Sequence, residues 1–215
     1  MIQALSDILA PDESLRAGRF HFQKDRERFV VARGALRHIL SGYLKTLPEQ
    51  IHFSYNQYGK PALSEDGSRN LLSFNVAHSH EVALYAVARG REVGLDVELV
   101  REDFACREIA KRFFSAREVA ALRTVPKEQQ AMAFFNCWTR KEAYIKARGE
   151  GLSHPLDRFT VSLVPGETAS LLSTDDDPQE TSRWSLVELS PGAGYVAALA
   201  LEGAATTLHC WQWDR

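Results

Sequence analysis

The chain has 215 residues, of which 45% are hydrophobic and 25% are charged, and its formal net charge is −2. These values are typical of a soluble globular protein and allow one large domain or two small ones. A nearly neutral chain argues against a broad nucleic-acid-binding surface, although it is compatible with a local basic pocket. We therefore expect no nucleic-acid partner.

Cysteine usage and hydropathy indicate the compartment. The three cysteines, Cys106, Cys137 and Cys210, form no CxxC pair, which argues against a zinc ribbon or a disulfide framework and favours a reducing environment. The longest apolar run, residues 195–201, is too short to span a bilayer. The first residues lack the basic-then-apolar pattern of a signal peptide. We expect a cytoplasmic protein with no membrane association.

The chain begins with a helical pattern. Residues 1–20 are predicted to be helical, with a second helix start at Pro11. Apolar side chains at helical spacing predict one long amphipathic helix over residues 24–45. Arginines and lysines crowd residues 16–37. A solvated face, partly paired by acidic neighbours, explains most of these cations, and an anion site lined by a few of them is the alternative.

Strand-like segments follow. Residues 51–55 alternate like a short strand, and residues 56–61 (NQYGKP) are typical of a turn that holds the backbone of Lys60 while its ammonium projects. Residues 66–68 form another predicted loop. Short connections predict an antiparallel meander of three further strands, at residues 71–77, 82–88 and 93–100. The middle strand is nearly all apolar, so we expect it to be buried on both faces.

The third strand of this predicted meander carries two carboxylates on one face. Its apolar residues run at odd positions from Val93 to Leu99, whereas Gly94, Asp96 and Glu98 face the other way. The two carboxylates are then roughly 6.5–7 Å apart and repel each other if unpaired. Either this face is solvated or a cation holds both, and oxygen-only ligands favour Mg2+ or Mn2+.

His78 closes the first strand of the meander. A lone histidine at a strand end is more often structural or exposed than functional. Because it stands beside the acidic strand, contact with an anion is the second explanation.

A long helix is predicted for residues 127–148, after a shorter helix that begins at Ser115 with a capping-box spacing. Trp138, Glu142 and Lys146 lie one turn apart on one face of the long helix. Glu142 and Lys146 form either a solvated ion pair, worth only ~0.2–0.5 kcal/mol, or part of a catalytic face. Glu142 lies at the margin of the apolar stripe, where a carboxylate requires a partner.

The last third of the chain returns to strands. They are predicted at residues 159–164, 184–189, 195–201 and 207–213. Each half of the chain therefore has helices first and an antiparallel meander afterwards. We predict an α+β fold of two pseudo-symmetric subdomains, residues 1–100 and 101–215, with the active site in the groove between them.

The polar residues singled out divide into a metal site and a phosphate cradle. The acids are Asp96, Glu98 and Glu142, and the cations are Lys146, Lys60, His78 and the arginine cluster. Phosphoryl or pyrophosphate transfer needs such a set: a divalent ion on the phosphate oxygens, cations for the developing charge and a carboxylate near the nucleophile. Spacing alone leaves the phosphoester open.

Three segments in this order resemble the signatures of the 4′-phosphopantetheinyl transferases. They are residues 74–79 (FNVAHS), residues 94–98 (GLDVE) and residues 138–146 (WTRKEAYIK), the last followed by Gly149 and Gly151. Residues 59–61 (GKP) and 19–26 are also similar to the larger, surfactin-synthetase-type (Sfp-type) branch, in which two pseudo-symmetric halves occupy one chain. The resemblance covers residues 13–165, and motifs in this order are far more specific than any one alone.

The resemblance implies transfer of the phosphopantetheine arm of coenzyme A onto a serine of an apo acyl or peptidyl carrier protein, with release of 3′,5′-ADP. It also implies that Asp96, Glu98 and Glu142 hold Mg2+, or Mn2+, on the pyrophosphate. Glu142 is then the group that takes the serine proton, directly or through water. Lys146 neutralises the phosphate under attack or protonates the leaving side. A chain that contains both halves is expected to act as a monomer.

The same resemblance assigns the coenzyme site. Lys60, held between Gly59 and Pro61, would contact the coenzyme phosphates together with His78 and Arg16. Ala77 stands where the family usually has a serine, so any hydroxyl contact at this position is lost. An N-terminal strand common in the family is expected to be missing, or replaced by residues 1–10.

Two other functions remain open from the sequence. A different Mg2+-dependent phosphoryl transferase or hydrolase would act on coenzyme A or a nucleotide without a carrier protein. A non-catalytic module would bind an acidic carrier through Phe113, Phe114 and neighbouring arginines. The binding module is disfavoured because it has no need of three acids and Lys146.

Overall fold

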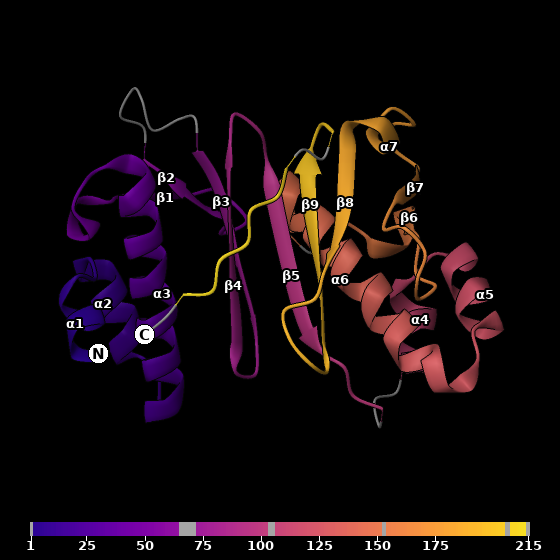
Figure 1. Cartoon of the computed structure of the whole chain (residues 1–215), viewed down its shortest axis with the longest axis horizontal. Coiled ribbons are helices and arrows are strands. Elements are labelled where there is room, and N and C mark those ends of the chain that lie inside the picture. The colour runs from indigo at the N-terminus through magenta and orange to yellow at the C-terminus, as the bar shows by residue number, and fades with distance from the viewer. Residues whose placement is uncertain (1, 65–71, 103–105, 152–153, 205–206, 214–215) are drawn as a thin grey trace. The chain divides into compact units, whose positions relative to one another are not determined.

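The computed structural model describes residues 2–64, 72–102, 106–151, 154–204 and 207–213 (Figure 1). The predicted loop at residues 66–68 lies outside these ranges. Two compact units are present, Met1–Tyr55 with Pro61–Asn70, and Asn56–Lys60 with Leu71–Arg215. The subdomain boundary after residue 100, and a groove between the halves, stay predictions.

The first unit is mainly helical. Its helices are α1 (Ile2–Asp7), α2 (Pro11–Gly18) and α3 (Gln23–Leu44). The predicted second start at Pro11 and the long helix are confirmed, and residues 2–7 form a helix. A short 3-10 turn (Pro48–Gln50) leads into the antiparallel pair β1 (Phe53–Tyr55) and β2 (Pro61–Leu63).

One cation of the predicted solvated face is buried in this unit instead. Arg37 is 1% exposed, and its Nε donates to Glu13 Oε2 at 2.7 Å. Its Nη1 donates to the carbonyl oxygens of Pro48 and Ile51. Burial is tolerated because these acceptors replace water around the guanidinium. Arg37 therefore joins α2, α3 and the residues before β1.

The second unit contains the predicted strands, but with a different pairing. Strands β3 (Leu72–Ser79) and β4 (Val82–Arg89) form the expected antiparallel hairpin. Strand β5 (Val93–Leu99) does not continue the meander: it pairs with β9 (Tyr195–Glu202), which also pairs with β8 (Trp184–Leu189), giving the order β5-β9-β8. The expectation for β4 is also wrong, because its central residues are only half-buried.

Helices α4 (Cys106–Phe113), α5 (Ala116–Thr124) and α6 (Gln130–Arg148) follow β5, with a 3-10 turn (Lys127–Gln129) before α6. The predicted capping box of α5 is confirmed, since Glu118 donates its backbone N–H to Ser115 Oγ and accepts the Ser115 N–H. Helix α6 packs on β5 and β9 (Figure 1). Its apolar stripe lies in the main hydrophobic core, as predicted, with Trp138 packed against that core.

Shorter elements complete this unit. They are a 3-10 turn (Leu156–Arg158), β6 (Phe159–Val161), β7 (Leu171–Thr174) and α7 (Glu180–Arg183). The strand predicted at residues 207–213 is wrong, because these residues carry no strand and are exposed. Both edges of β9 are already filled by β5 and β8, so the following residues have no open edge of β9 to join. Among the described residues, no helix combines the length and apolar character that a bilayer crossing demands.

Candidate active site

Strand β5 presents its carboxylates toward helix α6. A side chain at Gly94 would overlap the Ala143 carbonyl oxygen and the backbone of Ala147, so only glycine allows this close approach. Asp96 and Glu98 share that face of the strand by period-two alternation. The opposite face of β5 belongs to a separate apolar cluster. The predicted division of β5 into an apolar and an acidic face is confirmed.

Asp96 and Lys146 meet between this strand and α6. The Lys146 ammonium donates to Asp96 Oδ1 at 2.6 Å, and the Asp96 side chain is 9% exposed. The other oxygen, Oδ2, is buried and has no hydrogen-bond partner among the residues that the structure describes. Burial raises the pKa of Asp96 from 3.8 to about 7, which Lys146 opposes and Glu142 and Glu98 reinforce. The charged form of Asp96 is thus destabilised by burial and by the neighbouring acids.

Glu142 and Glu98 complete a cluster of acids with Asp96. Burial raises the pKa of the Glu142 carboxyl, an effect that Lys146 opposes and the charge of Glu98 increases. Glu98 Oε2 accepts a hydrogen bond from Ser79 Oγ at 2.9 Å. The structure therefore brings together the three predicted acids and Lys146. The Lys146 ammonium makes its short contact with Asp96, whereas helical spacing had suggested Glu142 as its partner.

The donor chemistry of this cluster suits a hard divalent cation. Three carboxylates on facing elements repel one another, and the buried Asp96 Oδ2 has no donor among the residues that the structure describes. A cation bound there would reduce the repulsion and give this oxygen a partner. As the side chains stand in the described part of the chain, no three His, Cys, Asp or Glu groups already converge on one ion. The Lys146 ammonium provides the positive charge beside Asp96.

The predicted turn around Lys60 lies at the C-terminal end of α6. Asn56 Nδ2 donates to the Gly149 carbonyl oxygen at 2.7 Å. The Lys60 ammonium donates to the Ala147 carbonyl oxygen at 2.9 Å and pairs with Glu92 at 2.7 Å. Contact with the last carbonyls of a helix is favourable for a cation. The ammonium, which was predicted to project from the turn, is therefore held by these partners.

The residues that flank Lys60 have backbone roles. Gly59 has a φ of +83°, a left-handed conformation that favours glycine, and Pro61 begins β2. His78 and Ala77 face opposite sides of β3: His78 is exposed, and Ala77 is buried in the apolar cluster beside β5. A hydroxyl at position 77 would therefore point to the buried side. Coenzyme contacts by these four residues stay predictions.

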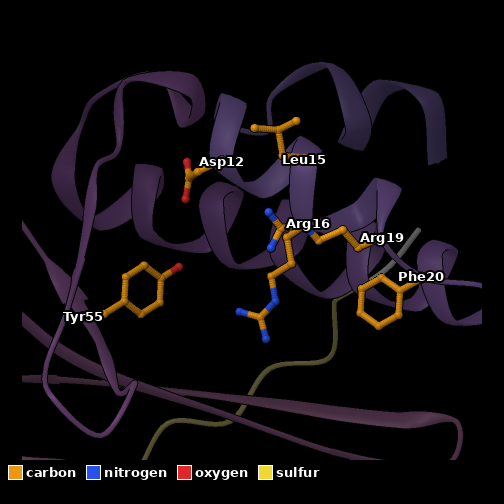
Figure 2. Close-up of a pocket in the computed structure, with 6 residues that line it drawn as sticks. All are labelled: Asp12, Leu15, Arg16, Arg19, Phe20 and Tyr55. Atoms are coloured by element: carbon orange, nitrogen blue, oxygen red, sulfur yellow. The ribbon is translucent and has the colours of Figure 1, made fainter.

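Arg16 belongs to the first unit, where it lines a pocket of about 690 Å³. The same pocket is lined by Asp12, Leu15, Arg19, Phe20 and Tyr55 (Figure 2). The Arg16 guanidinium also lies 5.4 Å from the ring centre of Phe29. Two arginines at one concave surface attract an anion. The pocket is therefore compatible with the phosphate contact of Arg16, which stays a prediction.

Comparison with known proteins identifies the family. Residues 92–200 match the model of the 4′-phosphopantetheinyl transferase superfamily, and residues 1–90 match that of the 4′-phosphopantetheinyl transferase N-terminal region. The chain belongs to the 4′-phosphopantetheinyl transferases.

Curated relatives agree with this assignment. The 4′-phosphopantetheinyl transferase HetI of Nostoc sp. is 41% identical over 212 residues, which cover 99% of this chain and 86% of HetI. A putative 4′-phosphopantetheinyl transferase of Synechocystis sp. is 33% identical over 186 residues, covering 86% and 74% of the two chains. The 4′-phosphopantetheinyl transferase Sfp of Bacillus subtilis is 32% identical over 156 residues, covering 73% and 67%.

This phosphopantetheinyl transferase is of the two-part, Sfp-type kind, and the prediction from its motifs is confirmed. Its reaction is the transfer of 4′-phosphopantetheine from coenzyme A to carrier proteins. That assignment sets aside the hydrolase and the non-catalytic binding module. The two family models in succession also agree with the predicted pair of halves.

Sequence reasoning missed a buried ion pair on the other side of α6 of this transferase. Lys141 is fully buried, and its ammonium lies 2.8 Å from Glu118 Oε1. It also donates to the carbonyl oxygens of Leu156 at 2.7 Å and Phe159 at 2.5 Å. The available signal was Glu118 itself, whose capping-box position predicts where one carboxylate oxygen goes but leaves the other unassigned.

Proposed function

We propose that the transferase uses a divalent ion, Mg2+, held by Asp96, Glu98 and Glu142, to pass the phosphopantetheine arm to a carrier serine. The products are the holo carrier and 3′,5′-ADP. The observation that carries this proposal is the Asp96 carboxylate, buried between Lys146 and two further acids with one oxygen unpartnered among the described residues. A divalent ion at such a site neutralises charge on the pyrophosphate oxygens.

Glu142 is the proposed proton acceptor. The serine oxygen attacks the phosphorus that bears the pantetheine arm, and the bond from this phosphorus to the 3′,5′-ADP oxygen breaks. The serine proton passes to Glu142, directly or through a water molecule. A carboxyl group whose pKa is raised is a better base than an ordinary glutamate, and burial raises the pKa of Glu142.

Lys146 and the remaining cations bind phosphate in this proposal. Lys146 is 31% exposed and lies one helical turn from Glu142, so its ammonium reaches the acids and still meets solvent. It would neutralise charge on the phosphate under attack. Lys60, His78 and Arg16 would contact the other phosphates of the coenzyme. Support for these three roles comes from the motif resemblance and, for Arg16, from the pocket shared with Arg19.

Two properties of the whole protein belong to the same proposal. We propose that it acts as a monomer, because two family halves already occupy one chain. We also propose a cytoplasmic location, because the cysteine pattern favours a reducing environment. Its partner is an apo acyl or peptidyl carrier protein. Mn2+ is the alternative ion, since it accepts the same oxygen ligands.

Intact-mass spectrometry tests the proposal. The protein is incubated with coenzyme A, Mg2+ and an apo carrier, and we expect the carrier to gain one phosphopantetheine group. Glu142→Gln and Asp96→Ala should abolish this increment while the protein stays folded. Glu128→Gln, which alters an exposed carboxylate just before α6, is the control and should behave as the parent protein. The role assignment is wrong if Glu142→Gln keeps near-normal transfer.

A further inference from the structure

The acid-bearing strand is held differently along its two edges. On one edge β5 forms a backbone ladder with β9, in which Asp96 is opposite Ala198. On the other edge, two of its backbone N–H groups donate to side chains. Leu95 N–H donates to Asn75 Oδ1 at 3.0 Å, and Leu99 N–H donates to Ser79 Oγ at 3.2 Å.

Both acceptors come from β3 and match the spacing of the donors. Asn75 and Ser79 are four residues apart on β3, as Leu95 and Leu99 are on β5, so each pair points to one side of its strand. Asn75 and Ser79 are each 7% exposed. A buried N–H without an acceptor is destabilising, because it has lost its hydrogen bond to water and gained none in return. These side chains therefore fix the register of β5 against β3, whose own backbone ladder is with β4.

Ser79 differs from Asn75 because it also contacts an acid. Its hydroxyl donates to Glu98 Oε2 at 2.9 Å and accepts from Leu99 N–H. One oxygen atom, Ser79 Oγ, therefore holds both the Glu98 carboxylate and the backbone at the end of β5. A hydroxyl has a single proton, and here it is directed to Glu98. The ring Nδ1 of His80 lies 3.2 Å from the same Oγ on the solvent side.

We propose that Ser79 is a positioning residue for the transfer reaction, which ties the Glu98 carboxylate and the β5 backbone to β3 and so fixes one wall of the metal site. Asn75 fixes the opposite end of the same segment through the Leu95 N–H, and among the described residues it has no hydrogen bond to an acid. The inference rests on the proposed role of Glu98 in metal binding. Partners that orient a metal-binding carboxylate typically contribute about 10- to 100-fold in metal affinity.

Ser79 and Asn75 differ in a way that separates positioning of the carboxylate from simple stability. Both residues accept a β5 backbone N–H, so loss of either acceptor should lower the free energy of unfolding by a similar amount. Of these two residues, Ser79 is the one that donates to Glu98, so its loss removes a donor from the carboxylate and the loss of Asn75 does not. The expected signature is a change in metal dependence for Ser79 that exceeds the change for Asn75.

The test uses the full-length protein with Ser79→Ala, Ser79→Cys and Asn75→Ala. Cysteine keeps the volume of the side chain but donates only weakly, so it replaces the alanine variant if that variant fails to fold. We expect the Mg2+ concentration for half-maximal transfer to rise about 10-fold in the Ser79 variants. The rate at saturating Mg2+ should return to within about 3-fold of the parent. Mn2+ binding, measured by electron paramagnetic resonance with coenzyme A and no carrier, should weaken in parallel.

Ser162→Ala is the matched control. The Ser162 hydroxyl is also buried, donating to the Thr168 carbonyl oxygen and accepting from Ser170 N–H, each at 2.9 Å, and it accepts from the Arg140 guanidinium at 3.1 Å. Its loss should lower stability and leave the Mg2+ midpoint unchanged. An unchanged midpoint in both Ser79 variants, or an equal rise in Asn75→Ala, would overturn the positioning role.

Glu98→Gln distinguishes the inference from the proposal beneath it. If Glu98→Gln weakens Mn2+ binding and the Ser79 variants do not, the metal assignment stands and only the inference fails. If Glu98→Gln leaves Mn2+ binding and Mg2+ dependence unchanged, both fail together.

Discussion

Helix α6 carries two lysine–carboxylate pairs that have nearly the same length and different surroundings. Lys141 lies 2.8 Å from Glu118, and Lys146 lies 2.6 Å from Asp96. In the first pair both side chains have further hydrogen-bond partners. The Lys141 ammonium donates to two backbone carbonyls, and Glu118 accepts the N–H groups of Ser115 and Val161. In the second pair, Asp96 Oδ2 has no donor among the described residues.

This difference separates a structural pair from the pair that we propose to be functional. A buried pair with all its hydrogen bonds made fixes the position of a helix and offers nothing to a ligand. The Asp96 carboxylate is buried, has a raised pKa and has one oxygen without a hydrogen-bond partner among the described residues. Its charged form is therefore destabilised, and a bound cation would stabilise it. Hydrogen-bond satisfaction, and not contact distance, therefore distinguishes the proposed active side of α6 from its structural side.

The largest effect should come from breaking the structural pair. Lys141→Met leaves Glu118 buried and charged, so we expect the free energy of unfolding to fall by about 3–5 kcal/mol. Lys146→Met is the matched variant on the same helix. It should lower stability by at most about 2 kcal/mol but reduce transfer by about 100-fold or more. Urea unfolding and intact-mass rates measure both, and equal stability losses would remove the distinction.

The second prediction concerns the spacing of the active side. Gly94→Ala places a methyl group against the backbone of Ala143 and Ala147, where no flexible side chain can yield. Separating β5 from α6 should cost about 3 kcal/mol and reduce transfer, because Asp96 and Glu142 lie on the separated elements.

Gly42→Ala is the control for this variant. Gly42 lies in α3 with open space around its Cβ position, so alanine there should be neutral or stabilising by up to about 1 kcal/mol. Thermal unfolding and the transfer assay compare the two. Full activity in Gly94→Ala would show that the close approach of strand and helix is unnecessary.

The smallest predicted effect tests the unsatisfied carboxylate directly. Burial raises the pKa of Asp96 to about 7 in the folded protein, above the usual value of 3.8 that applies to the unfolded chain. The contribution of this group to stability is therefore complete at low pH and is lost as the pH rises toward 7. Without metal, the free energy of unfolding of the parent protein should fall by about 2 kcal/mol more than that of the Asp96→Asn variant between about pH 5 and pH 8. Urea unfolding in a chelator measures the difference, and parallel pH profiles would contradict it.

Local signals in the sequence were sufficient for most of the elements. The long helices follow from apolar spacing, the α5 cap from Ser115 and Glu118, and the two faces of β5 from alternation. The acids and Lys146 could be selected because carboxylates on a strand and at a core margin need an explanation. Motif order then gave the family.

The errors have one physical origin, since they concern partners distant in sequence. Alternation predicts that β5 is a strand, but it does not predict that its neighbour is β9. The same limit produced a false strand at residues 207–213 and hid the partner of Lys141. Hydrogen-bond satisfaction of Asp96 is likewise invisible in the sequence, because it depends on which groups other elements bring to it.

The pairing of β5 with β9 has a consequence for how the protein is made. The acidic strand emerges early from the ribosome, yet the backbone ladder that holds one of its edges is supplied only near the other end of the chain. Contacts so far apart in sequence form slowly, and an unpaired strand edge is exposed until they form. A nascent chain therefore contains all the proposed catalytic side chains before the strand that completes their sheet is made, and we expect a message cut short before β9 to yield a product that cannot modify carriers.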